Sequence, residues 1–506
     1  MKRLIISQKI PTRKKQVKKC RICRICRFCQ PPKVRQNEAL IFYRMFQKKF
    51  YSLIFEVLNI VKDMMNWQKL LSTKRFGMEE YHDEKKHDRT EYQRDYDRLI
   101  FSSPFRRLQN KTQVFPLPGS VFVHNRLTHS IEVSCVGRSL GMVVSKELRT
   151  KSPSSTADFE EIGSIVAAAC LAHDLGNPPF GHSGEKAIAS YFSEGSGKNL
   201  EREIREEGGR WEDLINFEGN ANSIRLLIHQ FSGRRKGGFV MTYSTLASIA
   251  KYPYSSEASG NKGKFGFFQS EEKDFIKIAN ELGLLTFQEK PLKYARHPLV
   301  YLVEAADDIC YQIMDLEDAH KLRIITTDKI TALLLDFFPE DRQIKLRKTM
   351  LIVKDVNEQI AYLRSSVIGL LVSECSRVFL ENEALILSGK FERSLIHHIS
   401  EKPQKAYSAC KKYSIENIYN SKDVLDIELA GYRIIGFLID ILIKAIQSPN
   451  ESYSRLLLDR VPEQYDVHDG SLYKRVLSIL DYISGMTDVY ALDLYRKITG
   501  MSLPAI

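Results

Sequence analysis

Residues 162–185 read IGSIVAAACLAHDLGNPPFGHSGE, and this stretch decides the fold and the chemistry expected of the chain. The apolar run up to Leu171 predicts a buried helix. This helix delivers the adjacent pair His173 and Asp174 to its end, where one metal ion could take a nitrogen and an oxygen ligand. After a Gly-Asn-Pro-Pro turn come His182 and Glu185, which share a face if that segment is helical. A carboxylate beside a histidine suits proton transfer.

A single His-Asp pair also fits an ordinary surface or capping pair, so the interpretation needs further polar residues in apolar helices. His129 is one, because apolar residues follow it at helical spacing and place it on or beside the apolar face. A histidine in that position is either a hydrogen-bonded core residue or a ligand. The sequence around it does not separate the two.

A polar stripe runs through a third apolar helix, which Pro298 can open. Asp307, Tyr311 and Asp315 recur every four residues and therefore share one face of that helix. Such a stripe is either a solvated face or, because its neighbours are apolar, a set of buried groups. A buried carboxylate needs a metal or a partner charge.

The order of these motifs resembles that of HD-domain phosphohydrolases, and more narrowly that of bacterial deoxyguanosine triphosphate triphosphohydrolases. The matching stretches are RRLQNKTQVFP at 106–116, RLTHS at 126–130, HDLGNPPFGH at 173–182, FEGNA at 217–221 and EAADDI at 304–309. The resemblance implies hydrolysis of deoxynucleoside triphosphates, dGTP foremost, to a deoxynucleoside and inorganic triphosphate. It also implies an all-α fold, an HD-domain helical bundle with additional C-terminal helices.

The resemblance further implies one divalent metal per subunit, which would polarise the α-phosphate and bring a water to it. Mn²⁺ or Mg²⁺ is expected, and two imidazoles with two carboxylates suit Co²⁺, Ni²⁺ or Fe²⁺ as well. The expected ligands are His129, His173, Asp174 and Asp307. His182 and Glu185 match the family's catalytic proton-transfer pair, and the residues leave open whether His182 acts as acid or as base.

Substrate contacts are expected by the same resemblance. Around the deoxyribose these are Gln113, Tyr311 and Asp315. The tyrosine would leave no room for a 2′-hydroxyl, so ribonucleotides would be rejected. Near the phosphates the matching residues are Arg126 and Asn220. Lys251 would add charge for the triphosphate, or is an ordinary solvated lysine.

Two alternative functions stay open at this stage. One is an HD phosphohydrolase that acts on another nucleotide phosphoester, and the other is a regulatory protein that binds nucleotides or nucleic acid. The expected partners are a dNTP substrate, further copies in a homo-oligomer (tetramer or hexamer) and, in some relatives, single-stranded nucleic acid. Guanine selectivity, the native metal, the oligomer size and activation by a second nucleotide are left undecided.

Long helical patterns dominate the chain, and strand-like alternation is scarce. Residues 65–330 are expected to form the catalytic core, and residues 331–506 to complete that core and make oligomer contacts. Helices are predicted over 275–285, 299–322, 344–379, 425–448 and 472–497. A polar stretch at 254–266 is expected to form a loop near the opening of the site.

Residues 1–64 differ from the remainder, with 17 lysines and arginines against three acids. The remaining chain is close to neutral, so the net charge of +13 belongs to this leader. Cys20, Cys23, Cys26 and Cys29 are each separated by two residues, a spacing that can bind zinc or an iron–sulfur cluster, but they lie in a low-complexity repeat and the last gap is one residue shorter than in the ferredoxin pattern. A non-native or disordered leader is favoured, with translation starting at Met64 or Met65. We expect no membrane span and a cytoplasmic location, where the scattered cysteines would stay reduced.

Overall fold

The computed structural model describes residues 64–81, 88–115 and 123–502, so the predictions made for the cysteine-containing leader fall outside the described residues. The described part of the chain is mostly helical, and this confirms the all-α prediction. Its one sheet is a hairpin of β1 (Thr286–Glu289) and β2 (Leu292–Tyr294). Within the described ranges, no helix combines the length and the apolar composition that a membrane span requires.

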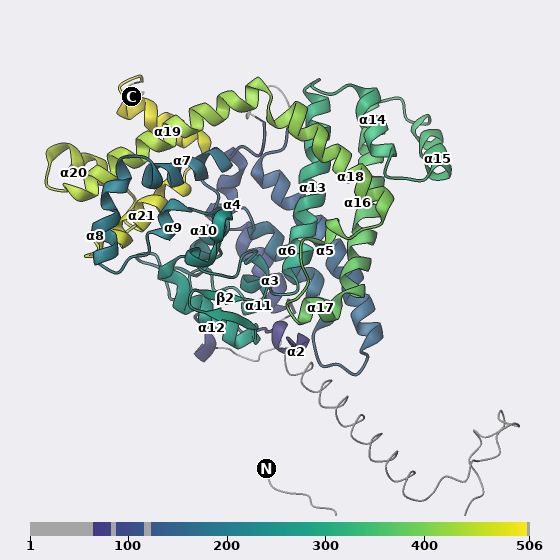
Figure 1. Ribbon diagram of the computed structural model, residues 1–506, viewed down its shortest axis with the longest axis horizontal. Helices are drawn as coiled ribbons and strands as arrows, with labels where there is room; N and C mark the ends of the chain where they lie inside the picture. The colour runs from purple at the N-terminus through teal and green to yellow at the C-terminus, as the bar shows by residue number, and fades with distance from the viewer. Residues whose placement is uncertain (1–63, 82–87, 116–122, 503–506) are drawn as a thin grey trace, which may run out of the picture. The chain divides into compact units, whose positions relative to one another are not determined.

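Three packed helices, α5 (Arg126–Lys151), α6 (Ile162–Ala172) and α13 (Val300–Lys321), form the centre of the fold (Figure 1). α5 begins at a capping box, in which the Asn125 side chain accepts a hydrogen bond from the Thr128 backbone N–H. α5 and α6 approach closely, since a Cβ added at Gly137 would lie 2.5 Å from the Cys170 Sγ. Almost every residue of α6 is buried, as expected of a helix that is apolar all round.

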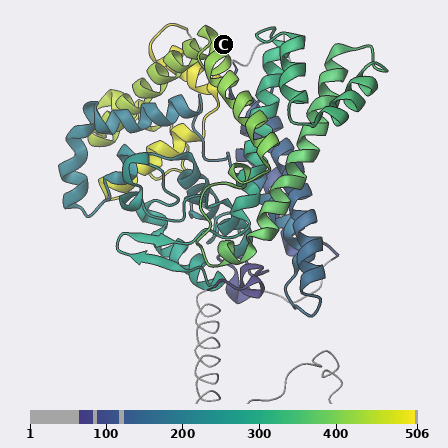
Figure 2. The same ribbon diagram turned by 45° about the vertical axis from the view of Figure 1, so that its right-hand side comes forward.

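The first hydrophobic core surrounds these three helices. α16 (Val356–Glu381) packs along both α5 and α13, and Figure 2 shows the green helices of this region side by side. The other helices contributing to this core are α2 (Trp67–Leu70), α3 (Glu91–Ile100), α4 (Ser103–Arg107), α10 (Gly219–Ile228), α11 (Tyr243–Ile249), α12 (Glu272–Leu282), α14 (Thr327–Leu335), α15 (Glu340–Met350), α17 (Glu383–Leu387) and α18 (Glu401–Ser414).

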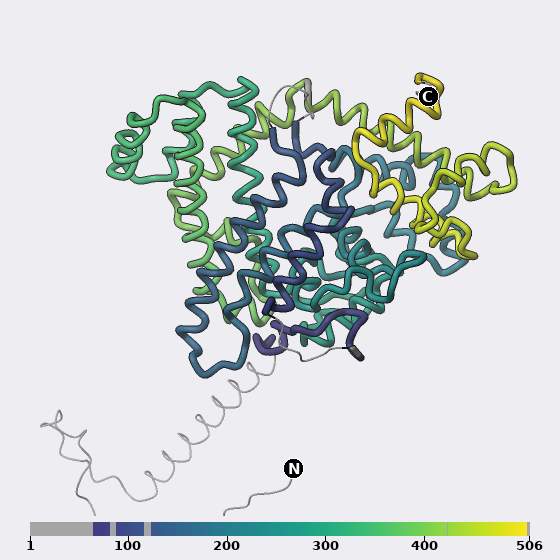
Figure 3. The backbone as a smooth tube through the Cα atoms, turned by 180° about the vertical axis from the view of Figure 1, so that it is seen from behind, coloured from purple at the N-terminus to yellow at the C-terminus, as the bar shows by residue number. Residues whose placement is uncertain are grey.

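The second hydrophobic core joins the segment after α6 to the C-terminal part of the chain. α19 (Lys422–Gln447) packs on α7 (His182–Ser193), α21 (Leu472–Ser484) and α22 (Asp488–Ile498), and Figure 3 shows the yellow C-terminal helices from behind. The remaining α-helices of this part are α8 (Glu201–Glu206), α9 (Glu212–Ile215) and α20 (Ser452–Leu458).

Short helical turns link these elements. The 3₁₀ turns are η1 (Glu79–Tyr81), η2 (Leu108–Asn110), η3 (Phe159–Glu161), η4 (Ser196–Leu200), η5 (Ser256–Ala258), η6 (Gly260–Lys262), η7 (Gln269–Glu271) and η8 (Leu395–His397), and η9 (Ile415–Tyr419) is a π-helical turn. Two of them, η5 and η6, lie within the predicted loop at 254–266.

Three of the predicted helices agree with α12, α13 and α19 within a few residues. Two others are wrong in length, because each is divided into two helices. The predicted helix 344–379 is broken between α15 and α16, where the Asp355 side chain caps the second helix. The predicted helix 472–497 is broken at 485–487, where Thr487 caps α22. Hydrophobic periodicity continues across both breaks, so it predicts one helix. The capping side chain starts a new helix at each break instead.

Candidate functional site

Four side chains predicted as metal ligands lie together where α5, α13 and the end of α6 meet. His129 comes from α5, His173 and Asp174 follow the last residue of α6, and Asp307 comes from α13. The Asp307 Oδ1 lies 3.2 Å from the His129 Nε2 and 3.6 Å from the His173 Nε2. Ligand atoms of His129, His173 and Asp174 lie within 4.8 Å of one another. Three distant parts of the sequence therefore converge on one small volume.

The hydrogen bonding of His173 suits a metal ligand. Its Nδ1 donates to the Cys170 carbonyl at 2.6 Å, so Nε2 is the ring nitrogen that can face a metal ion. Among the described residues, this buried Nε2 has no hydrogen-bond partner. Metal–ligand bonds of about 2.1 Å place neighbouring ligand atoms roughly 3 Å apart, close to the separations seen here. The donor set therefore fits a divalent cation.

Both carboxylates of this cluster are held in the ionised form that metal binding requires. Burial raises the pKa of Asp174, but Arg126 and the two histidines outweigh it and bring that pKa down to about 2. The Arg126 Nη1 donates to the Asp174 Oδ2 at 2.6 Å. Burial also opposes ionisation of Asp307, yet the His129 hydrogen bond and the charges of His173 and Lys251 lower its pKa well below the usual range.

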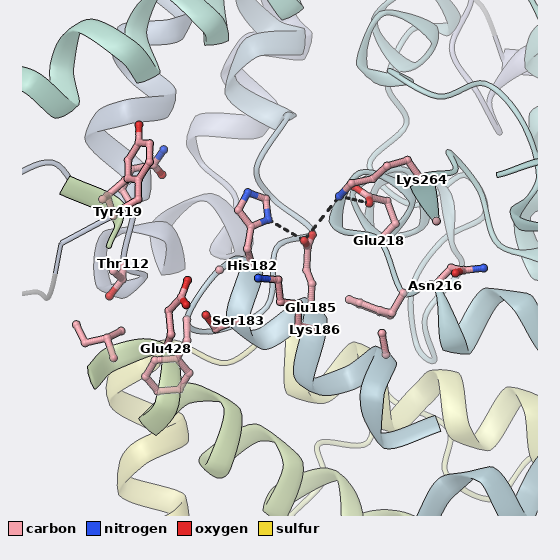
Figure 4. Close-up of a pocket in the computed structure, with 18 of the residues that line it drawn as sticks. Thr112, His182, Ser183, Glu185, Lys186, Asn216, Glu218, Lys264, Tyr419 and Glu428 are labelled. Carbon is pink, nitrogen blue, oxygen red and sulfur yellow. Dashed lines mark hydrogen bonds and ion pairs between the residues drawn. The ribbon is translucent and has the colours of Figure 1, made fainter. Parts of the chain in front are cut away.

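The predicted proton-transfer pair lies in the first turn of α7, as expected if that segment is helical. The His182 Nδ1 donates to the Glu185 Oε2 at 2.9 Å, and the Glu185 Oε1 accepts from the Gly219 N–H at 2.9 Å. The Lys264 ammonium lies 4.0 Å from Glu185 and 2.5 Å from Glu218 (Figure 4). The hydrogen bond to Glu185 raises the pKa of His182. The His182 side chain is 71% exposed, so the imidazole is accessible to a ligand.

Two neighbouring cavities surround these groups. The first has a volume of about 320 Å³ and contains the candidate metal cluster in its wall, and the second has a volume of about 700 Å³. Figure 4 shows residues that line the second cavity, including His182 and Glu185. The predicted substrate contacts that line the first cavity are Gln113, Arg126, Asn220, Lys251 and Tyr311.

Asp315 is placed differently from the other predicted substrate contacts. It is buried, lies outside the lining of both cavities, and its carboxylate accepts a hydrogen bond from the Tyr419 hydroxyl at 2.7 Å. Burial raises the pKa of Asp315 to about 8. The rings of Tyr419 and Tyr311 lie 5.8 Å apart, and both tyrosines line the larger cavity. A sugar contact by Asp315 therefore stays a prediction, with Tyr419 as its present partner.

The predicted phosphate contacts already have partners within the site. The Lys251 Nζ lies 3.3 Å from the Glu304 Oε1, and Arg296 forms a second ion pair with Glu304 at 2.9 Å. Burial opposes the charge of Lys251, but Glu304 and nearby carboxylates raise its pKa. The Asn220 amide donates to the Glu218 carboxylate. Binding of an anion here would therefore rearrange ion pairs that exist without it.

The sequence interpretation missed several polar residues of the first cavity. Lys264 lies in the polar stretch that the sequence predicts to adjoin the site, and Glu218 lies in the matching stretch FEGNA. The sequence therefore offers a reason to expect both residues near the site. Asn177, whose side-chain amide donates to the Asp174 Oδ1, lies within the HD motif itself. Tyr252 also lines the cavity, and it directly follows Lys251.

Comparison with known proteins gives two domain matches and a set of full-length relatives. Residues 126–252 match the HD domain, and residues 397–497 match the phosphohydrolase-associated domain. Two "Deoxyguanosinetriphosphate triphosphohydrolase-like" proteins, from Synechocystis sp. and Pseudomonas aeruginosa, are 36% and 37% identical, over 87% of this chain and their whole lengths. A "Deoxyguanosinetriphosphate triphosphohydrolase" of Yersinia enterocolitica is 30% identical over 80% of this chain and 93% of its own length.

Proposed function

Since the chain belongs to the HD-domain phosphohydrolases related to deoxyguanosinetriphosphate triphosphohydrolases, we propose that it hydrolyses deoxynucleoside triphosphates, dGTP foremost. The products are a deoxynucleoside and inorganic triphosphate. The observation that carries the proposal is the convergence of His129, His173, Asp174 and Asp307 on the wall of a cavity that also contains cationic side chains.

The four converging residues would hold one divalent metal, with Mn²⁺ or Mg²⁺ first among the candidates. Such a metal supplies Lewis-acid polarisation of the α-phosphate and a water of lowered pKa. The chain supplies a preformed arrangement for it, since Arg126 and Asn177 orient the Asp174 carboxylate by hydrogen bonds. A carboxylate that is already oriented loses little conformational freedom when it binds an ion.

His182 is the proposed proton-transfer group, and Glu185 orients it. Because the His182 Nδ1–H donates to Glu185, the other ring nitrogen is the atom that gives or accepts a proton. Glu185 is itself fixed by the Gly219 N–H and by the nearby Lys264. Protonation of the departing 5′-oxygen and deprotonation of water are both compatible with this arrangement.

Charge and shape of the first cavity support a triphosphate ligand. Arg126, Lys251 and Lys264 line it, and their cationic groups can meet the negative charges of a polyphosphate. Gln113 and Tyr311 line both cavities, a position that suits contact with the sugar between phosphate and base. Asp315 would act there through the Tyr419 hydroxyl or after that hydrogen bond opens.

The proposal includes a homo-oligomer. Leu351, Ile352 and Leu429 are 83%, 81% and 70% exposed, and apolar side chains of this kind are commonly buried between subunits. Light scattering of the purified chain tests this point, since a monomer at micromolar concentration would contradict it.

Product analysis tests the proposed reaction. The purified chain is incubated separately with each dNTP and Mn²⁺, and nucleosides and phosphates are resolved by chromatography. Deoxynucleoside and triphosphate in equal amounts support the proposal. Release of orthophosphate would favour the alternative phosphoesterase, and binding without turnover would favour a regulatory protein. A parallel series with GTP measures rejection of the ribonucleotide.

A further inference from the structure

Lys111 is a buried lysine whose ammonium is held by backbone carbonyls. Its Nζ donates to the Asn177 carbonyl at 2.6 Å and to the Ser484 carbonyl at 2.7 Å. Within the described residues Lys111 forms no ion pair. Burial lowers the pKa of Lys111 to about 7. Burial of an ammonium group costs free energy unless its N–H donors have acceptors. The hydrogen bonds to these two carbonyls therefore hold the Lys111 side chain and the two backbone segments together.

Asp488 makes the complementary contacts from the first residue of α22. Its Oδ2 accepts from the Thr112 N–H at 2.8 Å, and its Oδ1 accepts from the Phe180 N–H at 2.9 Å. The carboxylate is buried, and both of its oxygens are occupied by backbone donors. Ser484 and Asp488 lie on either side of the break between α21 and α22 at 485–487, so both contacts come from one short segment.

Both residues bind the short turn between Asp174 and His182. Lys111 holds its start at Asn177, and the Asn177 side chain donates to Asp174. Asp488 holds its end at Phe180, whose φ of 60° lies in the left-handed region that is unfavourable for a residue with a Cβ. Gly181 follows with a φ of 57°, and His182 comes next. The strained end of the turn is thus stabilised from outside the turn.

We propose that Lys111 and Asp488 are positioning residues, through which segment 484–488 fixes the turn 177–181 and with it Asp174 and His182. The phosphohydrolase-associated region (397–497) is then a structural part of the catalytic centre rather than a separate appendage. This inference rests on the proposed function only where turnover is measured, because the geometry of the turn can be measured without substrate.

The decisive variant is Asp488→Asn in the full chain, since it keeps the shape of the side chain. Its NH₂ group must face either Thr112 or Phe180, so one backbone donor loses its acceptor. Lys111→Met is the second variant. The matched controls are Asp493→Asn and Lys444→Met, because Asp493 lies further along α22 and both controls remove exposed ion pairs.

Three measurements are made on each variant: hydrogen exchange of residues 177–182, Mn²⁺ affinity by titration calorimetry, and kcat and KM for dGTP. In Asp488→Asn we expect exchange in the turn to become about tenfold faster. We also expect about tenfold weaker Mn²⁺ binding and a fall in kcat that exceeds any change in KM. The controls should match the wild type in all three measurements.

Exchange of 177–182 and Mn²⁺ affinity equal to those of the controls would overturn the inference. Should Lys111→Met fail to fold, Asp488→Asn carries the test alone, with Asp488→Glu as its rescue variant. A wild-type chain that does not turn over any dNTP would refute the proposed function. The exchange and Mn²⁺ measurements would still decide the positioning role in that case.

Discussion

Replacing Glu185 with glutamine tests the proton-transfer pair without changing the size of the side chain. In the structure the two carboxylate oxygens have different donors, the His182 Nδ1–H and the Gly219 N–H, each at 2.9 Å. A glutamine has one acceptor oxygen, so its NH₂ group must face one of these donors. If the oxygen stays with Gly219, the NH₂ group faces His182 and forces the proton onto the other ring nitrogen.

The magnitude follows from the role that His182 loses. A positioned acid or base contributes about 10²- to 10⁴-fold to a rate, and Glu185→Gln both withdraws the charge and favours the wrong tautomer. We therefore expect kcat for dGTP to fall by at least about 100-fold. KM should change little, because neither group is proposed to bind the phosphates.

A pH profile of kcat/KM then separates the two roles left open for His182. The Glu185 hydrogen bond raises the pKa of His182, so its loss in Glu185→Gln lowers that pKa. If His182 acts as an acid, the alkaline limb of the profile moves to lower pH; if it acts as a base, the acidic limb does. Glu194→Gln, at an exposed site after α7, is the control. A variant with wild-type kcat and an unmoved profile would refute the proton-transfer role.

The remaining predictions concern stability and specificity. Burial opposes the charge of His124, but hydrogen bonds to Asp318 and Glu132 raise its pKa to about 10. The stabilisation of the folded state by protonated His124 is therefore complete below about pH 6.5 and is lost as the pH rises through 10. His124→Gln should cost about 2 kcal/mol of unfolding free energy at pH 6 and little at pH 10.5, by urea denaturation; equal losses at both pH values would contradict this. Tyr311→Ala should raise the GTP to dGTP ratio of kcat/KM by about tenfold, and an unchanged ratio would exclude a role in sugar discrimination.

Most of the helical fold could be predicted because apolar residues recur at helical spacing along partly buried helices and are nearly continuous along fully buried ones. α6 is the clearest case, since its sequence alone indicates burial on all sides. The breaks before α16 and α22 could not be predicted from that period, because each depends on one capping side chain, Asp355 and Thr487. A cap competes locally with a periodic pattern that would also support a continuous helix.

The candidate site shows the same division between local and long-range information. His173, Asp174, His182 and Glu185 are close in sequence, so their proximity could be predicted from one motif. The contacts of His129 and Asp307 with this motif were expected only from the family resemblance, and the other contacts between distant segments had no comparable signal. The hydrogen bond from Tyr419 to Asp315 joins residues 104 positions apart, and the one from Lys111 to Ser484 joins residues 373 positions apart. Such pairs are determined by packing of the whole chain.

Metal content measures the central claim most directly. The wild-type chain and Asp307→Ala are stripped of metal, titrated with Mn²⁺, and compared by calorimetry and by circular dichroism. The account predicts one tightly bound Mn²⁺ per wild-type chain, at least about a tenfold loss of affinity in Asp307→Ala, and the same helical content in both. An Asp307→Ala chain that binds Mn²⁺ as tightly as the wild type would contradict the assigned ligand set.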